Sequence, residues 1–216
     1  MYRLLAILIG YVFGNFLFGF LYGKMHNKDI RTLGSGNVGT TNTVRTMGVL
    51  PGVLTLFFDC FKVVLAYFVC GIIFSKTTDL GASYIKLLQA YAAFGAVIGH
   101  DFPAVLKFKG GKGIASSLGF LCVVLPETLP GAIVCFVLVV GFTRYVSLGS
   151  ILAAIVIFVE SLIFYRYDMF HFEGLFNTEV LLIIIFLVCL TIFLHRSNIK
   201  RLASGNENKF SFHPNV

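Results

Sequence analysis

Residues 2–22, with the sequence YRLLAILIGYVFGNFLFGFLY, form an apolar run long enough to cross a lipid bilayer. A transmembrane helix needs about 20 predominantly apolar residues, and only Arg3 carries a charge in this run. A cleaved signal peptide is the rival interpretation, but the run is long and contains no Ala-x-Ala-like cleavage site. We therefore expect a retained membrane-spanning helix.

Further apolar runs follow at approximately residues 52–75, 84–99, 114–142, 148–164 and 180–194. The composition agrees with a membrane protein, since 57% of the 216 residues are hydrophobic and the mean hydropathy is +0.89. Only 12% are charged, against about 25% in soluble domains. The chain has no obvious linker, repeat or low-complexity segment. We expect an all-α fold, a polytopic membrane helix bundle, that forms a single domain over residues 1–216.

The run over residues 114–142 is ambiguous, because Pro126, Glu127 and Pro130 interrupt it. As one helix it crosses the membrane once, and as two short helices it returns the chain to the side from which it came. Length favours one crossing, since each half is shorter than the roughly 17 residues of a full span. The distribution of charge favours two helices.

That distribution is uneven if the chain crosses seven times with its N-terminus outside. One side then receives four basic residues, namely Arg3, Lys76, Lys86 and Arg166. The other side receives twelve, namely Lys24, Lys28, Arg31, Arg45, Lys107, Lys109, Lys112, Arg144, Arg196, Lys200, Arg201 and Lys209. Cytoplasmic loops carry the excess of Lys and Arg, and six crossings would weaken this bias. We therefore predict seven transmembrane helices and a cytoplasmic C-terminus.

The first of two basic, glycine-rich loops covers residues 34–42, with the sequence GSGNVGTTN, and Arg45 follows it. Glycines permit backbone conformations in which successive N–H groups point at an anion. Hydroxyl and amide side chains can also bind phosphate oxygens, and a guanidinium matches phosphate geometry. An ordinary turn-rich loop is the alternative. The candidate phosphate-binding residues here are Ser35, Gly36, Asn37, Gly39, Thr41, Asn42 and Arg45.

The second loop follows residues 100–103, with the sequence HDFP, and contains FKGGKG at residues 108–113. It departs from the Walker phosphate-binding loop, which needs Gly-Lys-Ser/Thr, because Gly113 follows Lys112. It still places glycines and lysines directly before an apolar helix, whose N-terminus favours anions. A basic flank of a membrane span is the alternative. The candidates here are Lys109, Gly110, Gly111, Lys112 and Gly113.

Two shorter polar motifs lie at the edges of later spans. Ser147 and Ser150 stand at the start of an expected helix, where small hydroxyl residues are also typical caps. His195 and Asn198 share one helix face if the last span continues, although they also suit the end of a span at the interface. We take all four as candidate site residues.

Ionisable residues also lie inside the apolar runs or next to them. Asp59 and Lys62 are three residues apart, and an ion pair is the favoured interpretation because charges within a span are usually paired. A catalytic Asp59 is the alternative. We expect His100 to orient the second loop rather than to act as a general base. The five cysteines lie in apolar segments without a Cys-x-x-Cys motif. We therefore expect no disulfide, no metal and no cofactor.

Together the motifs strongly resemble the bacterial acyl-phosphate:glycerol-3-phosphate acyltransferases, over nearly the whole chain. The resemblance rests on Gly34, Ser35, Gly36, Asn37, Val38, Gly39, Thr41, Asn42, Arg45, His100, Pro103, Phe108, Lys109, Gly110, Gly111, Lys112, Gly113, Val146, Ser147, Leu148, Ser150, His195 and Asn198. It implies a seven-helix enzyme of the bacterial cell membrane with its site towards the cytoplasm. It also implies acyl transfer from acyl phosphate to the 1-hydroxyl of sn-glycerol 3-phosphate. The products are lysophosphatidic acid and phosphate, in the first step of phospholipid biosynthesis.

For this reaction we expect Ser35, Thr41 and Lys112 to hold the donor phosphate with the two glycine-rich loops. The residues expected to place glycerol 3-phosphate are Arg45, Ser150, His195 and Asn198. The two phosphates could be exchanged between these groups, and the general base is either His195 or the donor phosphate itself. Of the candidates, the expected catalytic residues are Ser35, Arg45, Lys112, His195 and Asn198.

The expected partners are the two substrates and membrane lipids, with no nucleic acid and no obligate protein partner. The alternative function is a membrane transporter of phosphate or an organic phosphate, which would also have basic, glycine-rich loops between spans. Such transporters often consist of repeated halves, and the sequence contains no repeat. A structural or lipid-binding membrane protein would explain the composition but not four ordered motifs.

Overall fold

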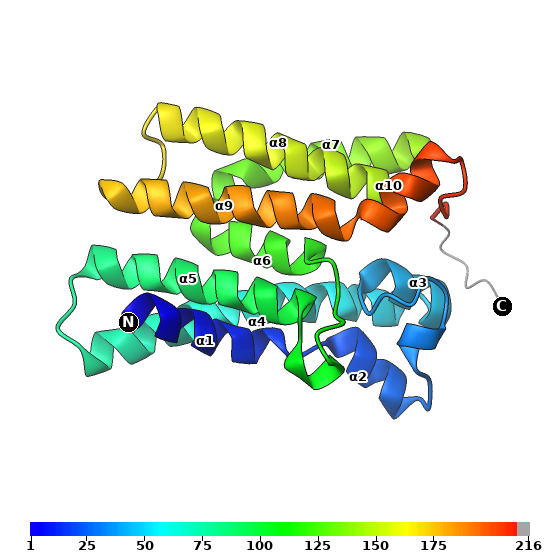
Figure 1. Ribbon diagram of the computed structural model, residues 1–216, viewed down its shortest axis with the longest axis horizontal. Coiled ribbons are helices and arrows are strands. Elements are labelled where there is room, and N and C mark those ends of the chain that lie inside the picture. Colours follow the sequence, from blue (N-terminus) through cyan, green and yellow to red (C-terminus); the bar gives the residue numbers. More distant parts are fainter. Residues whose placement is uncertain (211–216) are drawn as a thin grey trace. The chain divides into compact units, whose positions relative to one another are not determined.

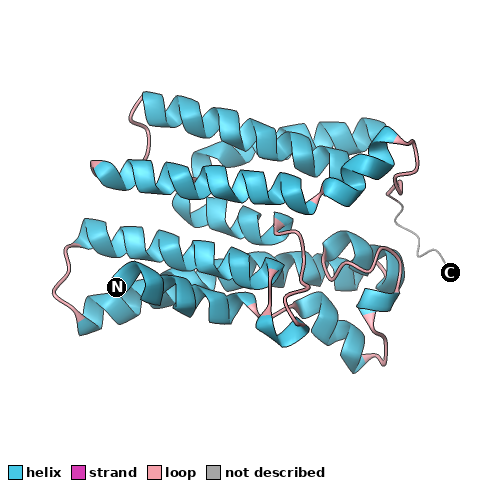
Figure 2. Ribbon diagram, in the orientation of Figure 1, coloured by secondary structure: helices cyan, strands magenta, loops and turns pink. Residues whose placement is uncertain are grey.

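The computed structural model describes residues 1–210, and within them all regular structure is helical, as the sequence predicts (Figure 2). The chain divides into two compact units, residues 1–123 and residues 124–210. Five helical stretches in the described part are long and apolar enough to cross a membrane. They are Tyr2–Met25, Val49–Thr77, Pro126–Thr143, Val146–Arg166 and Leu175–Leu194.

The first of these stretches is interrupted, whereas the sequence predicts a continuous helix. Helix α1 (Tyr2–Gly14) ends before Asn15, and α2 (Phe18–Met25) begins three residues later. At this break the Asn15 side chain shares a backbone acceptor with the helix. Its Nδ2 donates to the Tyr11 carbonyl at 2.7 Å, and the backbone N–H of Asn15 donates to the same oxygen at 3.2 Å. The break frees the carbonyl of Phe16 from the helical ladder, and a buried side chain satisfies it, as described below.

The first unit also contains α3 (Thr40–Met47), α4 (Val49–Thr77), α5 (Ala82–Asp101) and α6 (Ile114–Val124). Helices α1, α4 and α5 pack against one another (Figure 1). Glycines bring α1 and α5 into close contact, because a Cβ on Gly10 would collide with the Ala92 carbonyl and one on Gly95 with Ile7. Small residues allow such backbone approach between membrane helices.

Two elements of this unit differ from the apolar stretches named above. Helix α5 is 20 residues long but carries Lys86, Gln89, His100 and Asp101, which lower its hydropathy. Helix α6 is apolar but has only 11 residues, fewer than the roughly 17 expected of a full span.

The second unit contains α7 (Leu129–Thr143), α8 (Val146–Arg166), α9 (Leu175–Leu194) and the short α10 (Arg196–Ala203). Helix α8 packs against both α7 and α9 (Figure 1). The apolar run over residues 114–142 forms two helices, α6 and α7, separated by a 3-10 turn at Pro126–Thr128. The run is therefore divided into two helices, as the distribution of charge favours.

Candidate active site

Asn42, on the first turn of α3, organises the first glycine-rich loop. Its Oδ1 accepts from the backbone N–H of Ser35 at 2.8 Å, and its Nδ2 donates to the carbonyls of Leu33 at 3.0 Å and Asn37 at 2.9 Å. A third carbonyl, that of Ile30, lies 3.4 Å from the same nitrogen. The side chain is 2% exposed. Asn42 therefore closes the loop on itself through its side-chain amide.

The glycines of the first loop adopt conformations that other residues rarely take. Gly34 has a φ of 56° and Gly36 a φ of 73°, and a Cβ on Gly34 would collide with the Asn42 amide. Asn37 accepts from the N–H of Gly39 at 2.8 Å, which leads the chain into α3. The loop is thus a fixed structure directly before a helix that carries Arg45.

Most candidate side chains of this loop are accessible to a ligand. Ser35 is exposed, and Thr41 and Arg45 are half-buried. The neighbouring hydroxyl of Thr40 is buried without a hydrogen-bond partner. A polar ligand would supply that partner, because a buried hydroxyl that makes no hydrogen bond is costly.

The second glycine-rich loop meets the first through apolar side chains. Leu106, in the 3-10 turn Ala104–Leu106 of the second loop, belongs to one buried cluster with Val38 of the first loop. Leu17 and Ile30 complete that cluster. The structure thereby brings together two motifs about 70 residues apart in the sequence.

The second loop folds back onto the end of α5. The N–H of Gly110 donates to the Asp101 carbonyl at 3.1 Å, and that of Gly111 donates to the His100 carbonyl at 3.0 Å. In this structure these two N–H groups therefore donate within the protein. Both glycines also permit close approach, because a Cβ on either would collide with His100.

The remaining candidates of this loop lie at the N-terminus of α6. Lys112 is half-buried, and Gly113 has a φ of 70° with both carboxylate oxygens of Asp101 2.9 Å from the position of a Cβ. In the first turns of α6 the hydroxyls of Ser116 and Ser117 are buried without a hydrogen-bond partner. A helix N-terminus with neighbouring hydroxyl donors and a lysine favours a phosphate.

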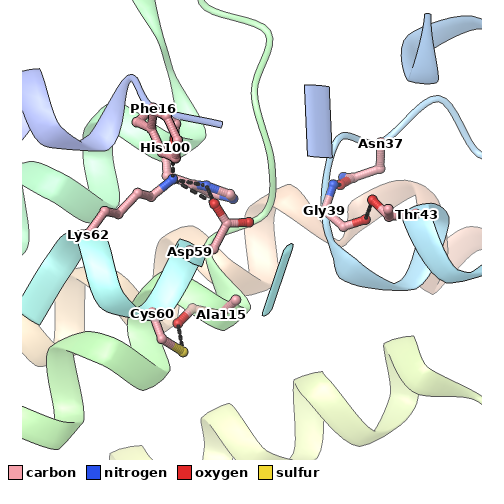
Figure 3. A network of polar contacts seen from close by, with 9 residues as sticks. All are labelled: Phe16, Asn37, Gly39, Thr43, Asp59, Cys60, Lys62, His100 and Ala115. Carbon is pink, nitrogen blue, oxygen red and sulfur yellow. Dashed lines mark hydrogen bonds and ion pairs between the residues drawn. The ribbon is translucent and has the colours of Figure 1, made fainter. Parts of the chain in front are cut away.

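A buried ionic network lies where the second loop leaves α5 (Figure 3). Lys62 Nζ is 2.8 Å from each of three acceptors, namely Asp59 Oδ1, His100 Nδ1 and the Phe16 carbonyl. The predicted Asp59–Lys62 ion pair is therefore confirmed. Lys62 also donates to the Phe16 carbonyl, which the break between α1 and α2 leaves without a helical partner.

In the second unit, Ser147 and Asn198 share a partner that sequence reasoning missed. Glu207 Oε1 accepts from Ser147 Oγ at 3.1 Å and from Asn198 Nδ2 at 2.8 Å, while its Oε2 accepts from Arg201 Nε at 2.8 Å. The Glu207 side chain is 6% exposed. No sequence signal distinguishes this carboxylate from others, because its partners lie on α8 and α10.

The other two candidates of this unit bond to their own helices. Ser150 Oγ donates to the Val146 carbonyl at 2.9 Å, so neither serine caps α8. His195 separates α9 from α10, and its Nδ1 lies 2.8 Å from the Thr191 carbonyl. A carbonyl only accepts, so Nδ1 carries the proton and Nε2 of a neutral ring bears the lone pair that a general base needs.

The helical architecture, with five stretches long and apolar enough to cross a membrane, and the two glycine-rich loops that share a buried cluster define a helical membrane protein. Comparison with known proteins makes the class specific. The sequence profile described as glycerol-3-phosphate acyltransferase matches residues 4–205. The chain belongs to this family, and it is a membrane acyltransferase.

Individual relatives are similar to this chain over most of their length. A glycerol-3-phosphate acyltransferase of Trichlorobacter lovleyi is 38% identical over 93% of both chains. One from Syntrophotalea carbinolica is 42% identical over 84% of both chains. A crystal structure of PlsY (YgiH), an integral membrane glycerol 3-phosphate acyltransferase in its glycerol 3-phosphate form, is similar with a TM-score of 0.79. It is 32% identical, over 97% of this chain and 96% of that one.

Proposed function

We propose that this protein transfers a fatty acyl group from acyl phosphate to the 1-hydroxyl of sn-glycerol 3-phosphate. The products are 1-acylglycerol 3-phosphate and inorganic phosphate. The reaction is the first step of phospholipid biosynthesis. The observation that carries the proposal is the buried apolar cluster that contains both Val38 of the first loop and Leu106 of the second. Family membership supports it, as do the PlsY structures in glycerol 3-phosphate and lysophosphatidic acid forms.

Acyl phosphate is a mixed anhydride whose leaving group is phosphate, so the reaction needs positive charge and hydrogen-bond donors more than a strong acid. Ser35, Thr41 and Lys112, with the two loops, bind the donor phosphate. Arg45, Ser150, His195 and Asn198 place the acceptor. The alternative is an exchange of the two phosphates between these groups. The remaining substrate-binding residues are Gly36, Asn37, Gly39, Asn42, Lys109, Gly110, Gly111, Gly113 and Ser147. Positioning the two substrates supplies much of the acceleration.

The acceptor hydroxyl must lose a proton as it attacks the carbonyl carbon. His195 is one candidate base, since a ring whose Nδ1 donates to the Thr191 carbonyl carries its lone pair on Nε2. The departing phosphate is the other, because it can take the same proton as the anhydride bond breaks. A pH–rate profile of His195→Ala decides between them. Loss of a limb of the wild-type profile supports His195, and an unchanged profile supports the phosphate.

The proposal includes an arrangement in the membrane. The spans are α1 with α2, then α4, α5, α6, α7, α8 and α9, which gives seven crossings with the N-terminus outside. The protein lies in the bacterial cytoplasmic membrane, and its glycine-rich loops and C-terminus face the cytoplasm. The whole chain acts as one acyltransferase domain. The twelve-to-four distribution of Lys and Arg supports this orientation.

The test is acyl transfer by the purified protein. It receives labelled glycerol 3-phosphate with palmitoyl phosphate, and in parallel with palmitoyl-CoA. Labelled lysophosphatidic acid from acyl phosphate alone is the expected result. Product from the CoA thioester alone would overturn the donor, and folded protein that makes no product from either would overturn the reaction.

Variants test the assignment of residues. Lys112→Ala and Arg45→Ala should each lower kcat/KM by roughly 100-fold, the usual cost of losing a group that stabilises developing charge. Lys107→Ala, at an exposed position in the same loop region, is the matched control and should retain activity. Full activity of both variants with folding intact would contradict the scheme.

A further inference from the structure

The network around Lys62 uses every hydrogen-bond donor of its ammonium group. The three acceptors, on Asp59, His100 and Phe16, lie at 2.8 Å each, and the Lys62 side chain is 4% exposed. Asp59 is on the same helix, Phe16 lies at the break between α1 and α2, and His100 is on α5 (Figure 3). One buried lysine therefore joins three segments of the first unit.

This geometry fixes the chemical form of His100. Nδ1 of His100 lies 2.8 Å from Lys62 Nζ and 3.4 Å from Asp59 Oδ1. With Lys62 charged, its ammonium group can only donate, so Nδ1 accepts from Lys62 and carries no proton. A doubly protonated ring would place two positive charges 2.8 Å apart, whereas the neutral ring places one cation beside the Asp59 carboxylate. His100 is therefore the neutral tautomer with its proton on Nε2.

The other edge of the same ring lies against the second glycine-rich loop. A Cβ on Gly111 would collide with Nε2 of His100, so ring and loop backbone are in direct contact. The carbonyl of His100 also accepts from the N–H of Gly111 at 3.0 Å. The orientation of this ring thus determines where the loop can lie.

Helix α4 contacts the far end of the loop as well. Cys60, which follows Asp59, directs its Sγ to the Ala115 carbonyl in the first turn of α6 at 2.9 Å (Figure 3). A Cβ on Gly119 would collide with the Cys60 carbonyl, so α4 and α6 are in close contact there. One turn of α4 therefore holds both the beginning and the end of the loop.

We propose that Asp59 and Lys62 are positioning residues for acyl transfer: through His100 they set the geometry of the second glycine-rich loop for a substrate phosphate. The inference rests on the proposed function in that the loop binds one of the two substrates. The residues of the network do not touch the substrate, and they act through the placement of the loop backbone and Lys112.

The experiment compares two variants of the network. His100→Asn keeps an acceptor at the position of Nδ1 for Lys62 but loses the ring edge against Gly111. The double variant Asp59→Asn with Lys62→Met removes the ion pair without leaving one buried charge alone. Each should raise the KM of one phosphate substrate about tenfold or more with kcat changed far less, since small displacements of binding groups are costly.

Thr55→Val is the matched control, because Thr55 is also buried on α4 but its hydroxyl bonds to the Pro51 carbonyl of the same helix. It should leave both KM values unchanged. The dissociation constant of inorganic phosphate is measured in parallel, and it should rise by a similar factor in the network variants. That measurement needs no turnover, so an inactive wild-type protein would refute the proposed function while this inference is still tested.

Unchanged KM and phosphate affinity in folded His100→Asn would overturn the inference. A loss of activity in proportion to the folded fraction, with KM unchanged in the remaining folded protein, would overturn it too, because a purely structural role predicts that pattern. A selective rise in KM for one substrate would support it and identify the phosphate that the second loop binds.

Discussion

The side-chain amide of Asn42 accepts from the backbone of Ser35 at 2.8 Å, so a residue on α3 fixes the loop that precedes it. Asn42→Asp retains the shape of this side chain but cannot donate to the carbonyls of Leu33 and Asn37. It also buries a carboxylate beside those oxygens. Since an unsatisfied buried polar group costs about 1–3 kcal/mol, we expect lower stability and loss of most acyl transfer.

Thermal unfolding in detergent and the acyl-transfer assay measure these two effects. Thr46→Val is the matched control, because its hydroxyl bonds only within α3, to the Asn42 carbonyl at 2.8 Å. It should leave activity near that of the wild type. Wild-type activity of Asn42→Asp would show that the loop does not depend on this amide.

Glu207 connects the start of α8 with α10, and its removal should affect both. Glu207→Ala leaves Ser147, Asn198 and Arg201 without the carboxylate they share, and we expect a loss of about 2 kcal/mol in the free energy of unfolding. Glu207→Gln keeps one oxygen for Ser147 and Asn198, so its loss should be smaller. Unfolding curves measure this order. Asn206→Ala, next to it on the surface, serves as control, and equal stability of all three variants would contradict the assigned role.

The contact between α1 and α5 leaves no room for larger side chains. Gly95→Val would drive its side chain into the backbone at Ile7, and we expect destabilisation of about 1–3 kcal/mol or a failure to fold. Gly141→Ala, on α7 with open space around the Cβ position, should be neutral. The expression levels and unfolding temperatures of the Gly95→Val and Gly141→Ala proteins are measured and compared. A Gly95→Val protein as stable as Gly141→Ala would mean that this helix pair can separate at little cost.

Asp29 makes stability sensitive to acid in the segment before the first loop. Hydrogen bonds from the Arg31 side chain, at 2.7 Å and 2.9 Å, hold the pKa of Asp29 well below its usual range. A carboxyl whose pKa is lowered by folding stabilises the protein above its unfolded pKa of about 4, and the effect fades as pH falls further.

The wild type should therefore lose more unfolding temperature between pH 6 and pH 3 than Asp29→Asn does. Asp79→Asn, at the exposed turn after α4, controls for the general effect of removing a carboxyl group. If Asp29→Asn and Asp79→Asn changed the pH dependence equally, the pairing with Arg31 would contribute nothing.

Periodic local patterns in the sequence were enough to predict several features. Apolar length predicts the spans, and a spacing of three residues on a helix predicts the Asp59–Lys62 pair that the structure contains. Pro126 and Pro130 mark the break between α6 and α7. The glycine-rich loops stand out because clusters of glycine and hydroxyl residues can be recognised directly in the sequence.

What sequence reasoning missed depends on contacts between distant residues. Glu207 meets Ser147 across 60 residues, and Lys62 meets the Phe16 carbonyl across 46, so no local pattern reveals either. The break after Gly14 had a local signal in Asn15, whose short amide side chain competes for backbone groups. The long apolar run around it concealed that signal.

The glycine contact between α1 and α5 has a consequence for how the protein is made. Tyr11 donates to the Phe102 carbonyl at 2.7 Å, and these two residues are 91 positions apart. As synthesis proceeds from the N-terminus, α1 enters the bilayer long before its partner leaves the ribosome. Until then the row of small residues on α1, namely Ala6, Gly10 and Gly14, faces lipid instead of α5. The loop of residues 34–42 likewise lacks the Leu106 side chain that shares its buried cluster. A ribosome stalled before α5 should therefore hold an inserted first helix that can still be crosslinked to lipid along that row.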